Sequence, residues 1–215
     1  MALSLGQLWR YPVKSMAGEQ IQRATLTDLG VPGDRLVWVR GPEGVRTARR
    51  QFQLLGLRGT LSPEGEVLVN GHPWDSPVAA ELVRAAAGED AWLERAPTGY
   101  QFDILPLLVA TDGAVAAFGR DIRRRRPNLL ITGVNGMDET TWEGAELNIG
   151  DAIIELDSLR GRCPMTTVDP DTITRDPAVL KDIGRRFGGR LALNAAVGRG
   201  GEIAVGNPVT LHRAR

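Results

Sequence analysis

Cys163 is the only cysteine of the chain, and it stands in a basic, turn-forming segment, residues 160–170 (RGRCPMTTVDP). Arg160 and Arg162 precede the thiol. A nearby guanidinium favours the thiolate, which is the form that attacks electrophiles and binds metals. Asp169 and the threonines before it can bond the backbone and hold a loop in shape. A lone cysteine is also often a small buried hydrophobe, and the residues of this segment leave both interpretations open.

Several common catalytic motifs are missing from the sequence. It contains no G-x-x-x-x-G-K-[ST], no G-x-G-x-x-G after a strand, no H-E-x-x-H and no G-x-S-x-G, which argues against P-loop, Rossmann, zincin and α/β-hydrolase sites. The only histidines, His72 and His212, are too few for most histidine-based metal sites. One cysteine excludes an internal disulfide and a cysteine-rich zinc site.

The charge balance narrows the class of partner. Basic and acidic residues number 26 each, so the formal net charge is zero, which argues against nucleic-acid binding by bulk charge. Lys14 and Lys181 are the only lysines, so nearly all the cations are arginines. The arginines are explained either by genome composition or by clamping of a small anion through bidentate hydrogen bonds.

Targeting signals are not evident in the sequence. No stretch approaches 18 consecutive apolar residues, and the start of the chain lacks a charged segment before an apolar run. We therefore expect no membrane-spanning helix and no secretory signal. The expected compartment is the cytoplasm, where a lone thiol stays reduced.

The elements that must position Cys163 are mostly strands. Alternation or compact apolar runs predict strands over residues 4–10, 21–27, 36–40, 105–110, 129–132, 152–159, 191–197 and 208–212. Asn70-Gly71 after residues 67–69 predicts a hairpin. Caps and stop residues predict helices over 77–87, after Ser76, over 112–118, and over 177–186. The fold class is mainly β with a few helices (α+β), with a barrel-like architecture.

Motifs spread along the chain resemble those of the MOSC domain family. Its cysteine motif resembles residues 162–170, and the opening motif of its N-terminal β-barrel domain resembles residues 11–15 (YPVKS). Further matches in order are residues 33–35 (GDR), 47–49 (TAR), 126–128 (RPN), Trp142 with 147–150, 187–189 and 203–209. The resemblance covers nearly the whole chain. Within the family, the chain is similar to the mitochondrial amidoxime-reducing components. It implies an N-terminal β-barrel-like domain over 1–94 packed with a MOSC β-barrel domain over 95–215.

The resemblance also implies a site. Cys163 would ligate the molybdenum of a molybdopterin cofactor, as a soft thiolate can. The cofactor-binding residues would be Lys14, Ser15, Arg35, Arg49, Arg126, Asn128 and Arg162. Asp103 would orient a ligand or substrate, or serve only as a turn carboxylate. From the run of arginines at 123–126 we expect only Arg126 to point inward, the others forming a solvated face.

The function implied is a molybdenum cofactor-dependent oxidoreductase that reduces small N-hydroxylated or other N–O compounds. Its partners would be a small-molecule substrate and a separate electron donor, an iron–sulfur or flavoprotein, because one cysteine cannot hold an iron–sulfur cluster. No nucleic-acid or membrane partner is expected, and recombinant protein can lack the labile cofactor. Two alternatives stay open: a sulfur carrier that uses a Cys163 persulfide, and a non-catalytic cofactor-binding protein.

Overall fold

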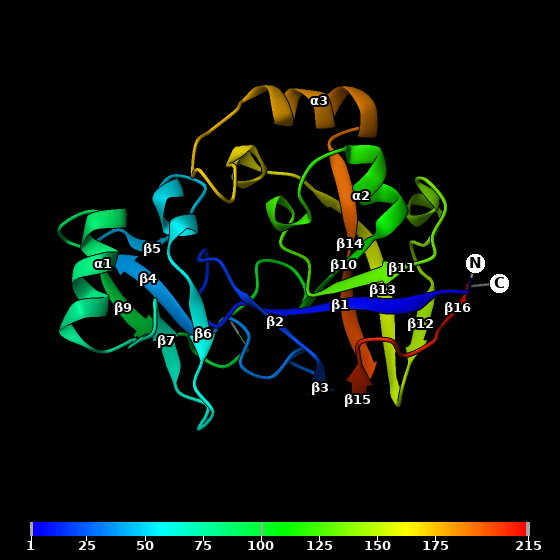
Figure 1. The fold of residues 1–215 in the computed structure, drawn as a ribbon, viewed down its shortest axis with the longest axis horizontal. Helices are drawn as coiled ribbons and strands as arrows, with labels where there is room; N and C mark the ends of the chain where they lie inside the picture. The colour runs from blue at the N-terminus through cyan, green and yellow to red at the C-terminus, as the bar shows by residue number, and fades with distance from the viewer. Residues whose placement is uncertain (1, 100, 214–215) are drawn as a thin grey trace.

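Two lobes lie side by side along the long axis of the molecule (Figure 1). A computed structural model describes residues 2–99 and 101–213. The large lobe is built on an eight-stranded sheet with the order β16-β12-β13-β14-β10-β11-β1-β2, and it also holds the two-stranded ribbon β15-β3. The small lobe holds two three-stranded sheets, β5-β4-β9 and β6-β7-β8, together with helix α1. This mixture of mostly strands with a few helices confirms the predicted α+β fold class.

The large lobe takes its strands from both ends of the chain. They are β1 (Ser4–Arg10), β2 (Glu19–Ile21), β3 (Arg23–Leu26), β10 (Leu107–Thr111), β11 (Leu129–Thr132), β12 (Glu146–Ile149), β13 (Ala152–Gly161), β14 (Arg190–Arg199), β15 (Gly201–Ala204) and β16 (Val209–His212). Its helices are α2 (Asp112–Phe118) and α3 (Ala178–Phe187), with the 3-10 turns η2 (Ile122–Arg124), η3 (Asp138–Thr141) and η4 (Pro164–Thr167). β1 pairs antiparallel with β11, so the start of the chain is built into this sheet.

The small lobe is made from residues between these two sets. Its elements are β4 (Val37–Gly41), β5 (Gly44–Arg46), η1 (Phe52–Gly56), β6 (Gly59–Leu61), β7 (Val67–Val69), β8 (His72–Pro73), α1 (Pro77–Ala87) and β9 (Trp92–Arg95). The Asn70-Gly71 turn joins β7 to β8 with both residues at positive φ, as the hairpin signal predicts. Ser76 caps α1 by accepting a bond from the Ala79 N–H, and Gly88 ends it.

The expected barrel of the large lobe is approached but not completed. β1 meets the chain just ahead of β16 through one bridge, Ser4 to Pro208, and through the bonds Leu5 N–H to Asn207 O and Val209 N–H to Leu3 O, both 2.9 Å. Within the described residues no paired ladder joins β1 to β16, so the sheet is not closed into a true barrel. The strand predicted over residues 21–27 is divided between two strands, β2 and β3. β2 pairs with β1, whereas β3 pairs with β15, so the chain changes its partner strand between them.

Each lobe has its own apolar core. The core of the large lobe includes Leu5 and Leu8 of β1 together with side chains of β10 to β16. The core of the small lobe gathers buried residues between Val13 and Ala91, and Met165 of η4 packs against it from the other lobe. The turn that follows Cys163 is therefore held between the two lobes.

Candidate functional site

A single cavity collects almost all of the residues singled out from the sequence. Its lining includes Lys14, Ser15, Arg35, Arg49, Asp103, Arg126, Arg162 and Cys163. The two lobes both contribute to this cavity, which we call the central cavity: the small lobe brings Arg49, and β13 with the segment after it brings Cys163. Residues more than a hundred positions apart in sequence thus surround one space.

Asn128 is the exception among the predicted site residues, because it does not line the central cavity. Its side-chain amide donates to the Asp34 carboxylate at 3.2 Å, and its Oδ1 accepts the Leu108 N–H at 3.1 Å. Asn128 is fully buried. The geometry makes it a positioning residue beneath the cavity wall, and a direct contact with a cofactor stays a prediction.

Asp34 is a buried carboxylate that organises the wall of the cavity. It accepts the Tyr11 N–H at 2.6 Å and pairs with the neighbouring guanidinium of Arg35. Burial raises the pKa of the Asp34 carboxyl above its ordinary value, against the Arg35 charge and the Tyr11 bond, which lower it. Arg35 is fixed in direction by these contacts and lies 5.7 Å over the ring of Phe102.

Three residues that line the cavity have left-handed backbone conformations. The φ angles are 72° at Ser15, 53° at Arg35 and 56° at Arg126. Residues other than glycine rarely adopt such angles, and strain of this kind gathers at functional sites. These three side chains are therefore held in the cavity at a cost in backbone strain.

Asp103 is the common counter-ion of three cations in the central cavity. Its carboxylate lies 2.7 Å from Lys14 Nζ, 2.6 Å from Arg49 Nη2 and 3.4 Å from Arg160 Nη2. Burial raises the pKa of Asp103, but the Lys14 hydrogen bond and the charges of the three cations outweigh it and leave the pKa below its usual range. Asp103 is therefore ionised near neutral pH, where it accepts hydrogen bonds and is a poor proton donor.

The expectation that only Arg126 of the arginine run 123–126 points inward is wrong. Arg124 and Arg125 are 8% and 1% exposed and also line the cavity. The cause is local geometry: η2 ends at Arg124, and Arg126 turns to positive φ, so the four side chains do not share one helical face. Arg123 alone behaves as expected, pairing with Asp121 and Asp171 at the surface.

Arg126 packs against the wall that Asp34 organises. Its guanidinium lies 4.3 Å from the centre of the Tyr11 ring and donates to the main-chain oxygen of Met16. Tyr11 in turn donates its hydroxyl to the Pro127 oxygen at 3.0 Å. Burial lowers the pKa of Arg126 to about 10, which still leaves it charged at neutral pH.

Cys163 lies between the end of β13 and the 3-10 turn η4, and the hydrogen bonds of that turn hold the cysteine loop in shape. The Cys163 oxygen accepts from the Thr166 N–H at 3.1 Å and from the Thr166 hydroxyl at 2.8 Å. Asp169 accepts the N–H groups of Asp171 and Thr172 and pairs with Arg124 at 2.7 Å. Asp169 therefore shapes the cysteine loop, and the half-buried thiol faces the cavity from a fixed backbone.

Arg162 is anchored beside the thiol by main-chain acceptors. Its Nη2 donates to the Arg125 oxygen at 2.9 Å and its Nη1 to the Leu191 oxygen at 3.4 Å. Burial lowers the pKa of Arg162 to about 10, while the Cys163 sulfur acts in the opposite direction. A charged guanidinium at this position stabilises an anionic sulfur.

Several residues of the cavity lie outside the set expected from the sequence. They are Thr47, Phe102, Arg124, Arg125, Arg160 and Asn194. A signal existed for Arg160, because it stands two residues before Arg162 directly after a predicted strand, and alternate side chains of an extended segment point to the same side. Arg125 had no such signal.

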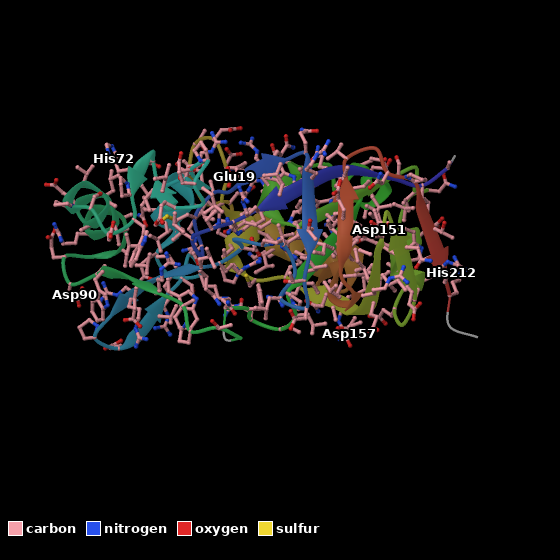
Figure 2. The ribbon with its side chains drawn as sticks, turned by 90° about the horizontal axis from the view of Figure 1, so that it is seen from below. Glu19, His72, Asp90, Asp151, Asp157 and His212 are labelled. Carbon is pink, nitrogen blue, oxygen red and sulfur yellow. The ribbon has the colours of Figure 1, made fainter. Side chains whose placement is uncertain are left out.

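The side chains that line the central cavity fit an anionic organic cofactor that carries its metal with it. Within the described residues no group of three or more His, Cys, Asp or Glu side chains could hold a metal ion, and Figure 2 places His72 and His212 at opposite ends of the long axis. Cys163 could supply one soft ligand, and the cavity's cations could hold negative charge. Three nitrogens of Arg125 and Nε of Arg162 are buried without a partner among the described residues, so hydrogen-bond donors remain for a negatively charged ligand.

The described residues contain no helix that is long and apolar enough to cross a membrane.

Comparison with known families gives two consecutive matches. The model for the MOSC N-terminal beta barrel domain matches residues 2–103, and the model for the MOSC domain matches residues 111–210. Between them the two models account for nearly all of the chain, and they confirm the resemblance drawn from the motifs.

Curated relatives are distant. The chain is 27% identical to mitochondrial amidoxime reducing component 2 of Macaca fascicularis over 79% of its own length and 68% of the relative. It is 26% identical to mitochondrial amidoxime-reducing component 1 of Mus musculus, over 79% of its length and 66% of the relative. The chain thus spans about two thirds of the length of these relatives.

Among solved structures, the YuaD protein from Bacillus subtilis matches over 100% of this chain and 98% of its own, with a TM-score of 0.56 and 13% identity. A hypothetical protein of known crystal structure matches with a TM-score of 0.51 and 13% identity, over 100% of this chain and 70% of its own. At these identities the likeness shows a shared fold.

Proposed function

This chain is a member of the MOSC family, with the family's N-terminal β-barrel domain ahead of its MOSC domain, and from that premise we propose a molybdenum cofactor-dependent oxidoreductase. Its substrates are small N-hydroxylated or other N–O compounds. The names of the curated relatives, amidoxime-reducing components, support this class of substrate. The domains divide near residues 94 and 95, and the compartment expected is the cytoplasm.

One observation carries the proposal: the single thiol of the chain lines the same cavity as a lysine and seven arginines. A buried set of cations needs an anion to offset its desolvation. A cofactor with a phosphate and a pair of sulfur atoms supplies that negative charge and completes a metal site to which Cys163 adds one ligand.

The proposed role of each cavity residue follows from its position in the cavity. Lys14 and Arg49, with Ser15 beside them, hold the phosphate end, as a point charge and a planar guanidinium can. Arg126 and Arg162 flank the Cys163 end of the cavity, where their positive charges act on the sulfur. Asp34 and Asn128 hold Arg35 and the wall beneath these contacts.

The reaction proposed is a two-electron reduction, in which R–NH–OH takes up two electrons and two protons and gives R–NH₂ and water. The bound cofactor supplies the electron transfer. The chain binds and orients the substrate. Asp103, ionised at neutral pH, orients the substrate by accepting hydrogen bonds. Electrons come from a separate donor protein, because the chain has one cysteine and cannot hold an iron–sulfur cluster of its own.

The test is turnover of an amidoxime by cofactor-loaded protein. A reduced viologen supplies electrons, and the amidine product is quantified. Wild-type protein and an Arg185→Met control, altered at an exposed helix position, are expected to form amidine at equal rates, and Cys163→Ser at less than about a hundredth of that rate. Equal rates in wild type and Cys163→Ser would overturn the proposal.

A further inference from the structure

Six of the eight cations that line the central cavity form two sets according to their counter-ions, and the other two, Arg35 and Arg124, pair with Asp34 and Asp169. The outer set, Lys14, Arg49 and Arg160, shares the carboxylate of Asp103. The inner set is Arg125, Arg126 and Arg162. Within the described part of the chain, no carboxylate comes within ion-pair distance of any inner cation, and their only acceptors are main-chain oxygens.

Arg125 is the extreme member of the inner set. It is 1% exposed, and its Nε, Nη1 and Nη2 have no hydrogen-bond partner among the described residues. Its guanidinium lies 5.5 Å over the ring of Phe118, an aromatic contact that leaves the N–H donors unused. Glu139, a buried carboxylate whose charge acts on Arg125, is already bonded to Thr111 and Ala192.

Such an arrangement is unfavourable without an added anion. A guanidinium carries five N–H donors, and burial of unpaired donors costs free energy for each one left unmet. Burial of a charge without a counter-ion costs further free energy, because the ion loses its hydration. Burial also lowers the pKa of Arg125, which reflects the same desolvation.

We propose that Arg125, Arg126 and Arg162 form an anion subsite beside Cys163, and that Arg125 makes the site selective for substrates carrying a carboxylate or similar acidic group near the N–O bond. Both this subsite and Cys163 belong to the lining of one cavity. The phosphate end of the cofactor is assigned to the outer set, and Arg125, which no motif assigns to the cofactor, is left for the substrate. The selectivity for substrate rests on the proposed function, whereas the anion subsite itself is a property of the protein without cofactor.

The first experiment therefore uses cofactor-free protein and needs no activity. Cys163, the only cysteine, is alkylated with iodoacetate, which is anionic, and with iodoacetamide, which is neutral. In both reactions the thiolate sulfur bonds to the CH₂ carbon and iodide leaves. Relative to glutathione, the iodoacetate-to-iodoacetamide rate ratio is expected to be at least about tenfold higher for the protein, as expected for a charge-assisted contact. A ratio equal to that of glutathione would overturn the subsite without any variant.

Variants then assign the effect to one side chain. Arg125→Met is expected to lower the rate ratio about tenfold, and Arg125→Lys to restore part of it. Arg123→Met is the matched control: it removes the same charge from the same run, but from a surface residue paired with Asp121 and Asp171. Its ratio should equal that of wild type. If Arg125→Met and Arg123→Met behave alike, Arg125 has no such role.

A loaded-protein experiment separates substrate from cofactor. The kcat/KM for a carboxylated aryl amidoxime is compared with that for the uncharged parent compound. Arg125→Met should lose the preference for the carboxylated compound and keep its molybdenum and pterin content. Loss of cofactor from this variant would assign Arg125 to the cofactor and overturn the substrate selectivity. If loaded wild-type protein shows no turnover but still reacts preferentially with iodoacetate, the proposed function is contradicted and the anion subsite is not.

Discussion

Asp103 lies 2.7 Å from Lys14, so the carboxylate predicted to orient substrate already neutralises the lysine predicted to hold a phosphate. Arg49 and Arg160 share the same carboxylate. Lys14 also donates to the main-chain oxygen of Gln101 at 3.2 Å. Asp103 is thus an internal anion in a cavity built for anions, and a bound ligand must share or replace its contacts.

Removal of this internal anion should strengthen the binding of an external one. Asp103→Asn is expected to raise the affinity of the cofactor-free protein for inorganic sulfate about fivefold, because exposed or partly exposed ion pairs contribute up to about 1 kcal/mol. Isothermal titration with sodium sulfate measures this. Asp90→Asn is the control, since Asp90 pairs with Arg46 at the far end of the small lobe (Figure 2). Weaker binding by Asp103→Asn would mean that the carboxylate organises the cations for their ligand.

The same carboxylate should give the protein an acid-dependent stability. The folded-state pKa of Asp103 is below its usual value, so its contribution is complete above the unfolded pKa of about 3.9 and is lost as the pH falls through the folded pKa. Wild-type Tm should therefore fall more steeply than that of Asp103→Asn below about pH 4, by a few degrees at most for a partly exposed group. Parallel Tm curves from pH 6 to pH 2.5 would contradict this.

Asn128 should matter to stability before any cofactor binds. Asn128→Ala removes buried bonds to Asp34 and Leu108 and is expected to lower the free energy of unfolding by about 2 kcal/mol. Urea denaturation of cofactor-free protein measures the loss. Asn148→Ala, which removes an exposed bond to His212, should lose less. An Asn128→Ala protein as stable as wild type but unable to bind cofactor would show a direct contact instead.

Asp169 should control the mobility of the cysteine loop. In Asp169→Ala the Asp171 and Thr172 N–H groups lose their acceptor, and Arg124 loses its ion-pair partner but keeps its bond to the Thr166 oxygen. Hydrogen exchange over residues 163–172 should become faster, with little change in β13. The comparison variant is Asp171→Ala, which loses only a surface pair with Arg123. If both variants exchange alike, Asp169 is not the residue that holds the loop.

The parts of the fold with local causes were predictable from sequence. The bounds of α1 follow from Ser76 and Gly88, and those of α2 from Thr111 and Gly119, because caps act on their own helix. Strand β1 has the predicted bounds, residues 4–10, although a register shift between Leu5 and Gln7 interrupts the alternation of its buried side chains. The partial closure of the large sheet was not predictable, because it depends on how the two ends of the chain meet.

The candidate site divides in the same way. Family motifs located Lys14, Arg49, Asp103 and Cys163, which line one cavity. The role of Asp103 as counter-ion to three cations could not be read from sequence, since those cations come from segments that only the tertiary fold brings together. A run of four arginines suggests a solvated face, and only the backbone turn at Arg126 reveals why Arg125 is buried.

The most direct test of the central claim is the molybdenum and pterin content of the protein. Wild type and Cys163→Ser would be produced in cells that make abundant molybdenum cofactor, beside a molybdoenzyme known to load there. We expect about one molybdenum and one pterin per wild-type chain, and loss of molybdenum from Cys163→Ser. If both proteins lack metal and pterin while the molybdoenzyme is loaded, the claim is wrong. A 32-dalton adduct on Cys163 after exposure to a cysteine desulfurase would then identify a sulfur carrier.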